Sequence, residues 1–538
     1  MKLNPRHANI LGFFALTAVA LWLRGAYLQW GIPGLYQIGM VPVPGLHPDE
    51  PVLVGQIEGL LRSPDRFPVF TYPPLHAIFG AILAWLSGLR ERTDLFFIAR
   101  SISVMASLAT VWTVFLLGRL WNRHLAWIGA IFMAVAMVAA HQAHWANPEA
   151  LCSLLITLGT WLYLRRPDLS SAVMAGAAIG LAFCSKYFGV LFLHLPVVAW
   201  LILPDGRPDR NRPLWQRWLA FYGTFGLTVT AVMGYYLWRD WTAFQRFLQI
   251  NSTWAHGAGL FGMHPAPVSS PSYTFSVLPF GLGYPIYACA LAGILLAVAR
   301  RRPQTLLVLL PLPFWVFLET LGYRPPRFSL HLLPFLCLLA AVLFHGWLDF
   351  HQGRWRYLPR LALATVIAYS LAYSASFIDC LDPARDARVA MENWSNARPP
   401  DTVALIGIDE VNYRLGVCQY RHSVGFSGPP IEEGHYQYLV VPGIFLEVLR
   451  QWSNLEATGY QYTKQDWWPA NPPAPELRAL VRKISRRDGY RKITSFSNRP
   501  NFLGIGMEAV RLPFSYFWLS NLDIQVYQVR ELPSGSNH

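Results

Sequence analysis

The sequence predicts a polytopic α-helical membrane protein that carries a small α/β domain at its C-terminal end. Of the 538 residues, 54% are hydrophobic, only 14% are charged, and the mean hydropathy is +0.30. Soluble chains carry about a quarter charged residues. Apolar runs of roughly 20 residues, the length that crosses a hydrocarbon core, recur along most of the chain. Residues 379–538 have mixed polarity instead and are expected to fold outside the membrane.

Arginines indicate the orientation of the spans. They cluster in short connections between apolar runs, and the positive-inside rule assigns such connections to the cytoplasm. The net charge of +14 therefore reflects membrane topology, and we expect no nucleic-acid partner. The basic connections lie at residues 119–123, 165–166, 207–217, 300–302 and 354–360.

The beginning of the chain poses a question of parity. Its first apolar run lacks a cleavage site and should remain as a span, with the N-terminus in the cytoplasm. Two runs, 73–89 and 95–118, then separate the first outer loop from the inner connection at 119–123, so only one of them can cross. Run 73–89 is short and starts with Pro73-Pro74, so we expect an in-plane or re-entrant helix. About eleven spans and an outer C-terminus follow. The apolar runs are 8–29, 73–89, 95–118, 124–142, 149–164, 171–184, 187–203, 218–237, 276–299, 305–322, 329–348 and 361–378.

The chain is accordingly divided into a membrane part, residues 1–378, and an extracytoplasmic α/β domain, residues 379–538. Cys380 and Cys418 fall in the second part and could form a disulfide there. Asp382-Pro383 has the pattern of an N-cap followed by proline at the first helical position. The expected strands are 402–409, 437–441 and 522–529, and the expected helices are 384–396 and 475–487.

The first outer loop contains the sequence His47-Pro48-Asp49-Glu50. Two adjacent carboxylates resist ionising together, so the pKa of one can rise while the other stays charged, which suits a general base. Asp49 is also a common type of N-cap. The following residues, from Leu53 to Leu61, place apolar side chains at helical spacing. We expect this helix to lie at the membrane surface with its apolar face in lipid, the alternative being a loop helix packed on protein.

Further charged residues are expected on the same outer face. Glu149 follows the turn His141 to Pro148, and its alternative role is helix capping. Lys186 lies between two apolar runs, and Arg327 and His331 open a later run. Arginine binds phosphate in bidentate fashion, and ionisable groups at membrane depth are functional hypotheses, although lysine can also snorkel at a span end. This set predicts transfer chemistry on a lipid-linked phosphate.

These motifs resemble the GT-C glycosyltransferases. The features that carry the resemblance are HPDE in a long first outer loop, a PPLH run, an acid after a later span, SKYFG and RFxLHLLP. They are most similar to the branch of protein O-mannosyltransferases, lipid A aminoarabinose transferases and bacterial polyprenyl-phosphate-sugar transferases, over about residues 8–350. The resemblance implies an enzyme of the cell envelope, in the inner membrane, that takes a sugar from a polyprenyl-phosphate donor on the outer face.

The resemblance also assigns roles to the acids. Asp49 falls on the position of the catalytic acid, expected to deprotonate the acceptor as the sugar inverts. Glu50 completes the same motif, and Glu149 stands where relatives carry a second acid. The acceptor implied is a lipid, a glycan or a protein, with membrane lipids around it.

The donor phosphate must be held differently from the aminoarabinose branch. Tyr72 precedes Pro73-Pro74 where that branch has a phosphate-binding lysine. Lys186, Arg327 and His331 are the expected substitutes, with Tyr72 beside them. This departure argues against membership of that branch.

A divalent metal ion would also find ligands here. His47, His141, His144 and Glu149 are of the right type, but histidines at span ends are more often interfacial, so no metal is included in the predicted site. The main alternative function is a transporter of a lipid-linked or small anionic substrate. Transporters usually show repeated halves and broken helices at matching positions. Here the ionisable residues gather on one face and no repeat is visible.

Overall fold

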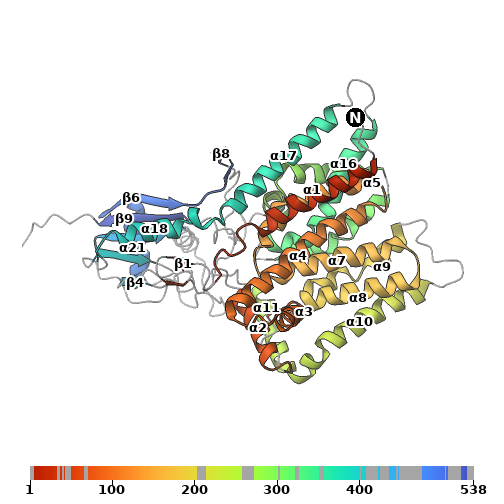
Figure 1. Cartoon of the computed structure of the whole chain (residues 1–538), viewed down its shortest axis with the longest axis horizontal. Coiled ribbons are helices and arrows are strands. Elements are labelled where there is room, and N and C mark those ends of the chain that lie inside the picture. The colour runs from red at the N-terminus through yellow and green to blue at the C-terminus, as the bar shows by residue number, and fades with distance from the viewer. Residues whose placement is uncertain are drawn as a thin grey trace, which may run out of the picture.

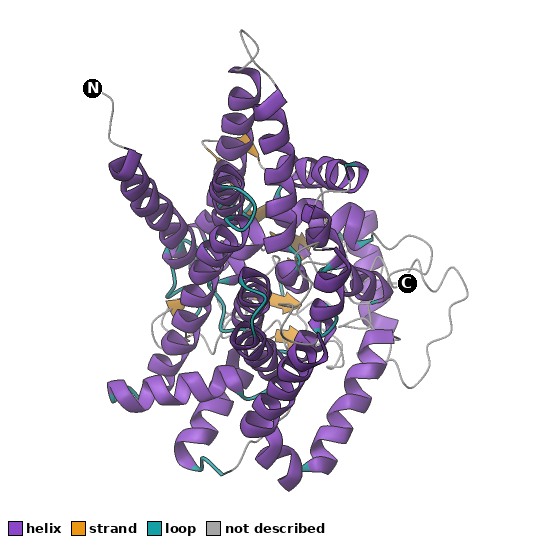
Figure 2. Cartoon of the chain, turned by 90° about the vertical axis from the view of Figure 1, so that its right-hand side faces the viewer, coloured by secondary structure: helices purple, strands orange, loops and turns teal. Residues whose placement is uncertain are grey.

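The computed structural model consists of a large helical bundle beside a smaller part that contains most of the strands (Figure 1). Figure 2 shows that helices make up most of the chain. The structure describes residues 5–32, 37–38, 41–42, 50–65, 71–202, 214–256, 272–300, 303–321, 326–350, 357–399, 402–406, 422–424, 436–443, 446, 475–502, 505–506 and 523–529.

The helices of the bundle follow the apolar runs of the sequence closely. By length and composition, three described segments could cross a membrane: Arg92–Gly118, Pro303–Thr320 and Tyr357–Asp379. Shorter apolar helices accompany them, and the number of spans stays a prediction. The elements are α1 (Pro5–Gly25), β1 (Gln37–Ile38), β2 (Val41–Pro42), α2 (Glu50–Arg62), α3 (Leu75–Ser87), α4 (Arg92–Gly118), α5 (Arg123–Ala134), α6 (Met137–Gln142), α7 (Pro148–Arg165), α8 (Leu169–Ser185), η1 (Tyr187–Phe192), α9 (Leu195–Ile202), α10 (Leu214–Arg239), α11 (Trp241–His256), η4 (Tyr273–Val277), α12 (Leu278–Leu282), α13 (Tyr284–Ala299), η5 (Pro303–Thr305), α14 (Leu306–Leu309), α15 (Leu312–Thr320), η6 (Pro326–His331), α16 (Leu333–Phe350) and α17 (Tyr357–Asp379).

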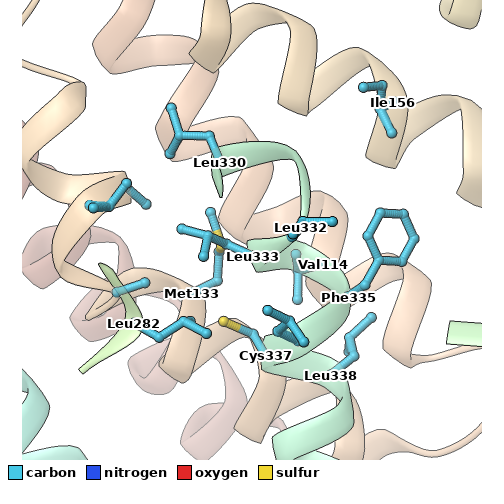
Figure 3. Close-up of a cluster of buried hydrophobic side chains, with 14 of the residues drawn as sticks. Val114, Met133, Ile156, Leu282, Leu330, Leu332, Leu333, Phe335, Cys337 and Leu338 are labelled. Atoms are coloured by element: carbon cyan, nitrogen blue, oxygen red, sulfur yellow. The ribbon is translucent and has the colours of Figure 1, made fainter. Parts of the chain in front are cut away.

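The core of the bundle lies where α4, α5, α7, α13 and α16 pack on one another. Figure 3 shows part of it, with buried side chains of η6, α16, α4, α5 and α7 that belong to one hydrophobic cluster. Close approach of helices needs small residues: a Cβ added to Gly293 of α13 would lie 1.9 Å from the Leu339 carbonyl oxygen. The labelled side chains are Val114, Met133, Ile156, Leu282, Leu330, Leu332, Leu333, Phe335, Cys337 and Leu338.

The predicted run 124–142 is not one helix, because the chain breaks between α5 and α6. A broken helix leaves backbone carbonyls without intrahelical partners. The fully buried Arg24 of α1 donates to the carbonyls of Met133 (3.0 Å) and Ala134 (2.8 Å), and Ser374 of α17 donates to that of Val135 (2.6 Å). These donors stabilise a break from which α6 leads to Glu149.

The helix that follows the acidic pair packs on protein. In α2, Leu53, Val54 and Ile57 are fully buried and Leu60 is nearly so, in a cluster shared with α3, α4 and α11. The expectation that this apolar face lies in lipid is therefore wrong, and the alternative of a packed loop helix holds. Periodicity identified the apolar face correctly but could not say what covers it.

The C-terminal part contains a five-stranded sheet with the order β4-β3-β5-β9-β6. Strand β3 is parallel to β4 and β5, while β9 is antiparallel to β5 and β6. Cys418 lies outside the described residues, so its disulfide with Cys380 stays a prediction. The strands are β3 (Val403–Ile406), β4 (His422–Val424), β5 (Tyr438–Pro442), β6 (Tyr490–Ser497), β7 (Asn501–Phe502), β8 (Ile505–Gly506) and β9 (Asp523–Val529), and the helices are η8 (Pro383–Arg385), α18 (Ala387–Asn396) and α21 (Pro475–Arg486).

The first helix of this part begins later than the sequence suggested. Asp382 accepts from the Ala384 N–H and so caps only the short η8. Asp386 is the N-cap of α18, accepting from the Arg388 N–H at 2.9 Å. The Asp386 carboxylate also accepts from the Trp30 indole N–H at 3.2 Å, which ties this helix to the segment that follows α1.

Candidate active site

Glu149 is the centre of the candidate site. It lies in the first turn of α7, where Pro148 occupies the first helical position and Asn147 is the N-cap. Its side chain is only 1% exposed, and Oε1 lies 3.1 Å from Lys186 Nζ and 3.3 Å from Arg327 Nε. A carboxylate bound to two cations from distant segments does more than cap its own helix.

Lys186 points into the protein. It is the residue directly after α8, and its side chain is 11% exposed. The ammonium lies 4.4 Å from the centroid of the Tyr72 ring, with Phe188 and Phe328 at 5.7 and 5.5 Å. Cations are attracted to the faces of such rings. Lys186 pairs with Glu149 and lies near three aromatic rings, so it does not extend toward the membrane surface as the snorkelling alternative requires.

Arg327 and His331 come from η6, one turn apart. Arg327 is 7% exposed, and His331 is fully buried with its ring centroid 5.7 Å from that of Phe188 and 5.2 Å from that of Phe314. Neither ring nitrogen of His331 has a hydrogen-bond partner within the described part of the chain. The imidazole thus keeps its polar atoms available beside Glu149 and Lys186.

The structure therefore brings together five of the predicted site residues from four separate segments: Tyr72, Glu149, Lys186, Arg327 and His331. Two cations share one carboxylate, so Glu149, Lys186 and Arg327 together carry one net positive charge. Such a cluster, largely withdrawn from water, attracts an anion more strongly than the same charges would in bulk solvent. The rings of Phe188 and Phe328 lie near the Lys186 ammonium. Neither ring was among the predicted site residues, although Phe328 directly follows Arg327 and Phe188 lies two residues after Lys186.

The acidic pair is described only in part. Asp49 and His47 lie outside the described residues, so the role of Asp49 stays a prediction. Glu50 is fully buried at the start of α2, and Arg100 donates to both of its oxygens at 2.7 Å. Arg100 was not predicted as the partner of Glu50, although a charged residue within the apolar run 95–118 was a signal that an ion pair was needed there.

Two of the histidines considered as metal ligands, His141 and His144, contact other groups. His144 lies with Nδ1 3.0 Å from the Ala140 carbonyl oxygen and Nε2 2.7 Å from that of Ala26. His141 Nδ1 accepts from the Trp145 indole N–H at 3.4 Å. Among the residues that the structure describes, no three or more His, Cys, Asp or Glu side chains form a group that could hold a metal ion.

Comparison with protein families decides the class of this chain. The family model of the Alg9-like mannosyltransferases matches residues 68–398, more than half of the sequence. The chain belongs to the Alg9-like mannosyltransferase family. The matched segment contains Tyr72, Glu149, Lys186, Arg327 and His331.

Membership of a mannosyltransferase family confirms the prediction of a glycosyltransferase and decides for an enzyme over a transporter. Solved structures show the same fold, as the resemblance to GT-C glycosyltransferases predicted. One is ArnT from Cupriavidus metallidurans bound to undecaprenyl phosphate, with a TM-score of 0.50 at 15% identity over 85% of this chain and 96% of that one. Another is the archaeal oligosaccharyltransferase AglB from Archaeoglobus fulgidus in complex with an inhibitory peptide and a dolichol-phosphate, with a TM-score of 0.53 at 13% identity over 91% and 80% of the two chains. No curated protein sequence matches the chain significantly.

Proposed function

We propose that this member of the Alg9-like family transfers a sugar from a polyprenyl-phosphate carrier to an acceptor on the outer face of the cell membrane, inverting the anomeric carbon. The observation that carries the proposal is the pairing of Lys186 and Arg327 on Glu149. A polyprenyl-phosphate sugar is a phosphodiester with one negative charge, and the side chains of Glu149, Lys186 and Arg327 sum to one positive charge. These three side chains therefore complement the charge of the donor.

The leaving group explains why two cations are useful. As the acceptor oxygen attacks the anomeric carbon, the bond from that carbon to the phosphate oxygen breaks and its electron pair stays on the phosphate. The departing phosphate gains negative charge, and positive groups already in place stabilise that charge in the transition state. Lys186 and Arg327 supply these groups, Glu149 orients them, and Tyr72 holds the ammonium of Lys186 at its ring.

The acceptor must lose a proton as it attacks. Asp49 takes this proton as general base, the role that its place in the HPDE motif implies. His331 offers ring nitrogens to the phosphate or the sugar. In this proposal residues 1–378 form the catalytic membrane domain, and residues 379–538 lie outside the cytoplasm, where they border the acceptor.

The carriers bound in similar structures support a lipid-linked donor. The ArnT structure contains undecaprenyl phosphate and the AglB complex contains a dolichol-phosphate, so the shared fold accommodates polyprenyl phosphates in two proteins of low sequence identity. The acceptor of this chain is a lipid, a glycan or a protein.

The test is sugar transfer by the purified chain in lipid nanodiscs, supplied with a panel of polyprenyl-phosphate sugars and an envelope extract as acceptor. Release of polyprenyl phosphate and labelled product should appear with one sugar of the panel, and Asp49→Asn should lower the rate of both by about 10²- to 10⁴-fold. Asp94→Asn, an acid in the first turn of α4 with no proposed role, is the matched control. Unchanged transfer by Asp49→Asn, at normal membrane insertion, would refute the proposed base.

A further inference from the structure

The Glu50–Arg100 pair joins four segments of the chain at one point. Arg100, on α4, donates from Nε to Glu50 Oε1 and from one terminal nitrogen to Glu50 Oε2, both at 2.7 Å. Its other terminal nitrogen donates to the carbonyls of Leu28 and Trp30, both at 2.6 Å. Glu50 Oε1 also accepts from the Ala146 N–H at 2.7 Å. Helices α2 and α4, the end of the α1 region and the turn before α7 thus meet on one ion pair.

Both oxygens of Glu50 are consumed by these contacts. The carboxylate is fully buried and Arg100 is 1% exposed, so neither is placed to touch a substrate. Breaking a buried ion pair is costly, but replacing both members by apolar residues is often neutral or stabilising. Stability alone therefore does not explain this pair. Its contacts with four segments indicate that it holds these segments in place relative to one another.

The contacts of the Glu50–Arg100 pair lie close in sequence to Asp49 and Glu149, the two acids of the proposed mechanism. Glu50 is joined directly to Asp49, and consecutive Cα atoms are about 3.8 Å apart. Ala146 lies three residues before Glu149, in the turn that opens α7. A carboxylate that accepts from Ala146 and is clamped to α4 therefore fixes the start of α2, the residue directly after Asp49, relative to the turn that opens α7.

We propose that Glu50 and Arg100 are positioning residues, which set the distance between the base Asp49 and the phosphate-binding group around Glu149. The inference rests on the proposed function, since it assigns a role through Asp49. Glu50, which the sequence predicted to be catalytic, is thus assigned a positioning role, and Arg100 shares that role.

The test compares Glu50→Gln with Glu58→Gln, in purified protein reconstituted in nanodiscs. Glu58 pairs with Arg92 at 3.0 Å and joins the same two helices, but this pair is partly exposed, so it controls for the loss of an α2–α4 ion pair. A misplacement of about 1 Å can cost about 100-fold in rate. We expect Glu50→Gln to lower kcat by about 10- to 100-fold with the donor KM changed by less than about threefold. Glu58→Gln should match the wild type.

A second comparison separates positioning from general loss of structure. If Glu50 acts through Asp49, the residual rate of Asp49→Asn/Glu50→Gln should equal that of Asp49→Asn alone, because residues that act as a unit are not additive. Arg100→Lys keeps the positive charge but loses the two parallel hydrogen bonds of the guanidinium, so its kcat should lie between those of the wild type and Glu50→Gln. If Glu50→Gln does not fold, Arg100→Lys takes its place, and its combination with Asp49→Asn should again be no slower than Asp49→Asn alone.

Three results would overturn the proposal: kcat of folded Glu50→Gln within twofold of wild type, a raised KM with kcat unchanged, or a further fall when Glu50→Gln is added to Asp49→Asn. Activity retained by Asp49→Asn is a different outcome, since it refutes the proposed function itself.

Discussion

Replacing Lys186 by methionine removes one cation from the proposed phosphate site while keeping the length and apolar character of the side chain. The remaining partners of Glu149 include Arg327 at 3.3 Å, so the buried carboxylate stays compensated. Removing Glu149 instead would leave two buried cations side by side. Lys186→Met is therefore the change that tests the site with the least damage to the fold.

The expected loss follows from the charge and its surroundings. Opposite unit charges about 4 Å apart attract by about 4 kcal/mol at an effective dielectric constant of about 20. Glu149 already offsets part of the charge of Lys186, and the side chain is 11% exposed. We therefore expect a loss of about 2–3 kcal/mol of transition-state stabilisation, which is about 30- to 150-fold in kcat/KM.

The assay measures polyprenyl phosphate released from the donor identified in the panel, with equal amounts of folded protein in nanodiscs. Lys186→Arg retains a cation and should recover most of the activity, whereas Arg246→Gln, at an exposed arginine of α11, should match the wild type. A loss below about threefold in Lys186→Met, or an equal loss in Lys186→Arg, would show that the positive charge of Lys186 does not act on the phosphate.

Two further changes test the packing around the site. Glu149→Gln breaks a buried ion pair and should lower the free energy of unfolding by about 3–5 kcal/mol. Added polyprenyl phosphate should then raise the melting temperature of this variant more than that of the wild type, because the negative charge that competes for Lys186 and Arg327 has been removed. An unchanged melting temperature without ligand would contradict the predicted loss of stability. Arg24→Met removes the donors to the Met133 and Ala134 carbonyls and should cost about 2–4 kcal/mol by the same melting assay. Arg246→Gln is the control, and equal melting of the two variants would show that the break does not depend on Arg24.

The positions of the helices could be predicted from the sequence because the length of an apolar run is a local property. Helices α4, α7, α8, α10 and α17 begin and end within a few residues of the predicted runs. The break after Ala134 was not predictable in this way. Residues 132–140 contain neither glycine nor proline, and the break depends on donors from Arg24 and Ser374, which are distant in sequence.

The candidate site could be predicted in part for a similar reason. Glu149, Lys186, Arg327 and His331 were expected together because each lies at an end of an apolar run assigned to the outer face. The partner of Glu50 could not be identified, since Arg100 lies 50 residues further along the chain and several arginines were equally eligible. The direction in which α2 turns its apolar face was missed because a helical period is the same against lipid and against protein.

The most direct test of the central claim is an experimental structure of the chain in nanodiscs with bound polyprenyl phosphate. We expect the phosphate density within hydrogen-bond distance of Lys186 Nζ and the guanidinium of Arg327, with the carboxylate of Asp49 facing the same opening. Phosphate density bound elsewhere, with the ion pairs of Glu149 closed off from it, would contradict the account.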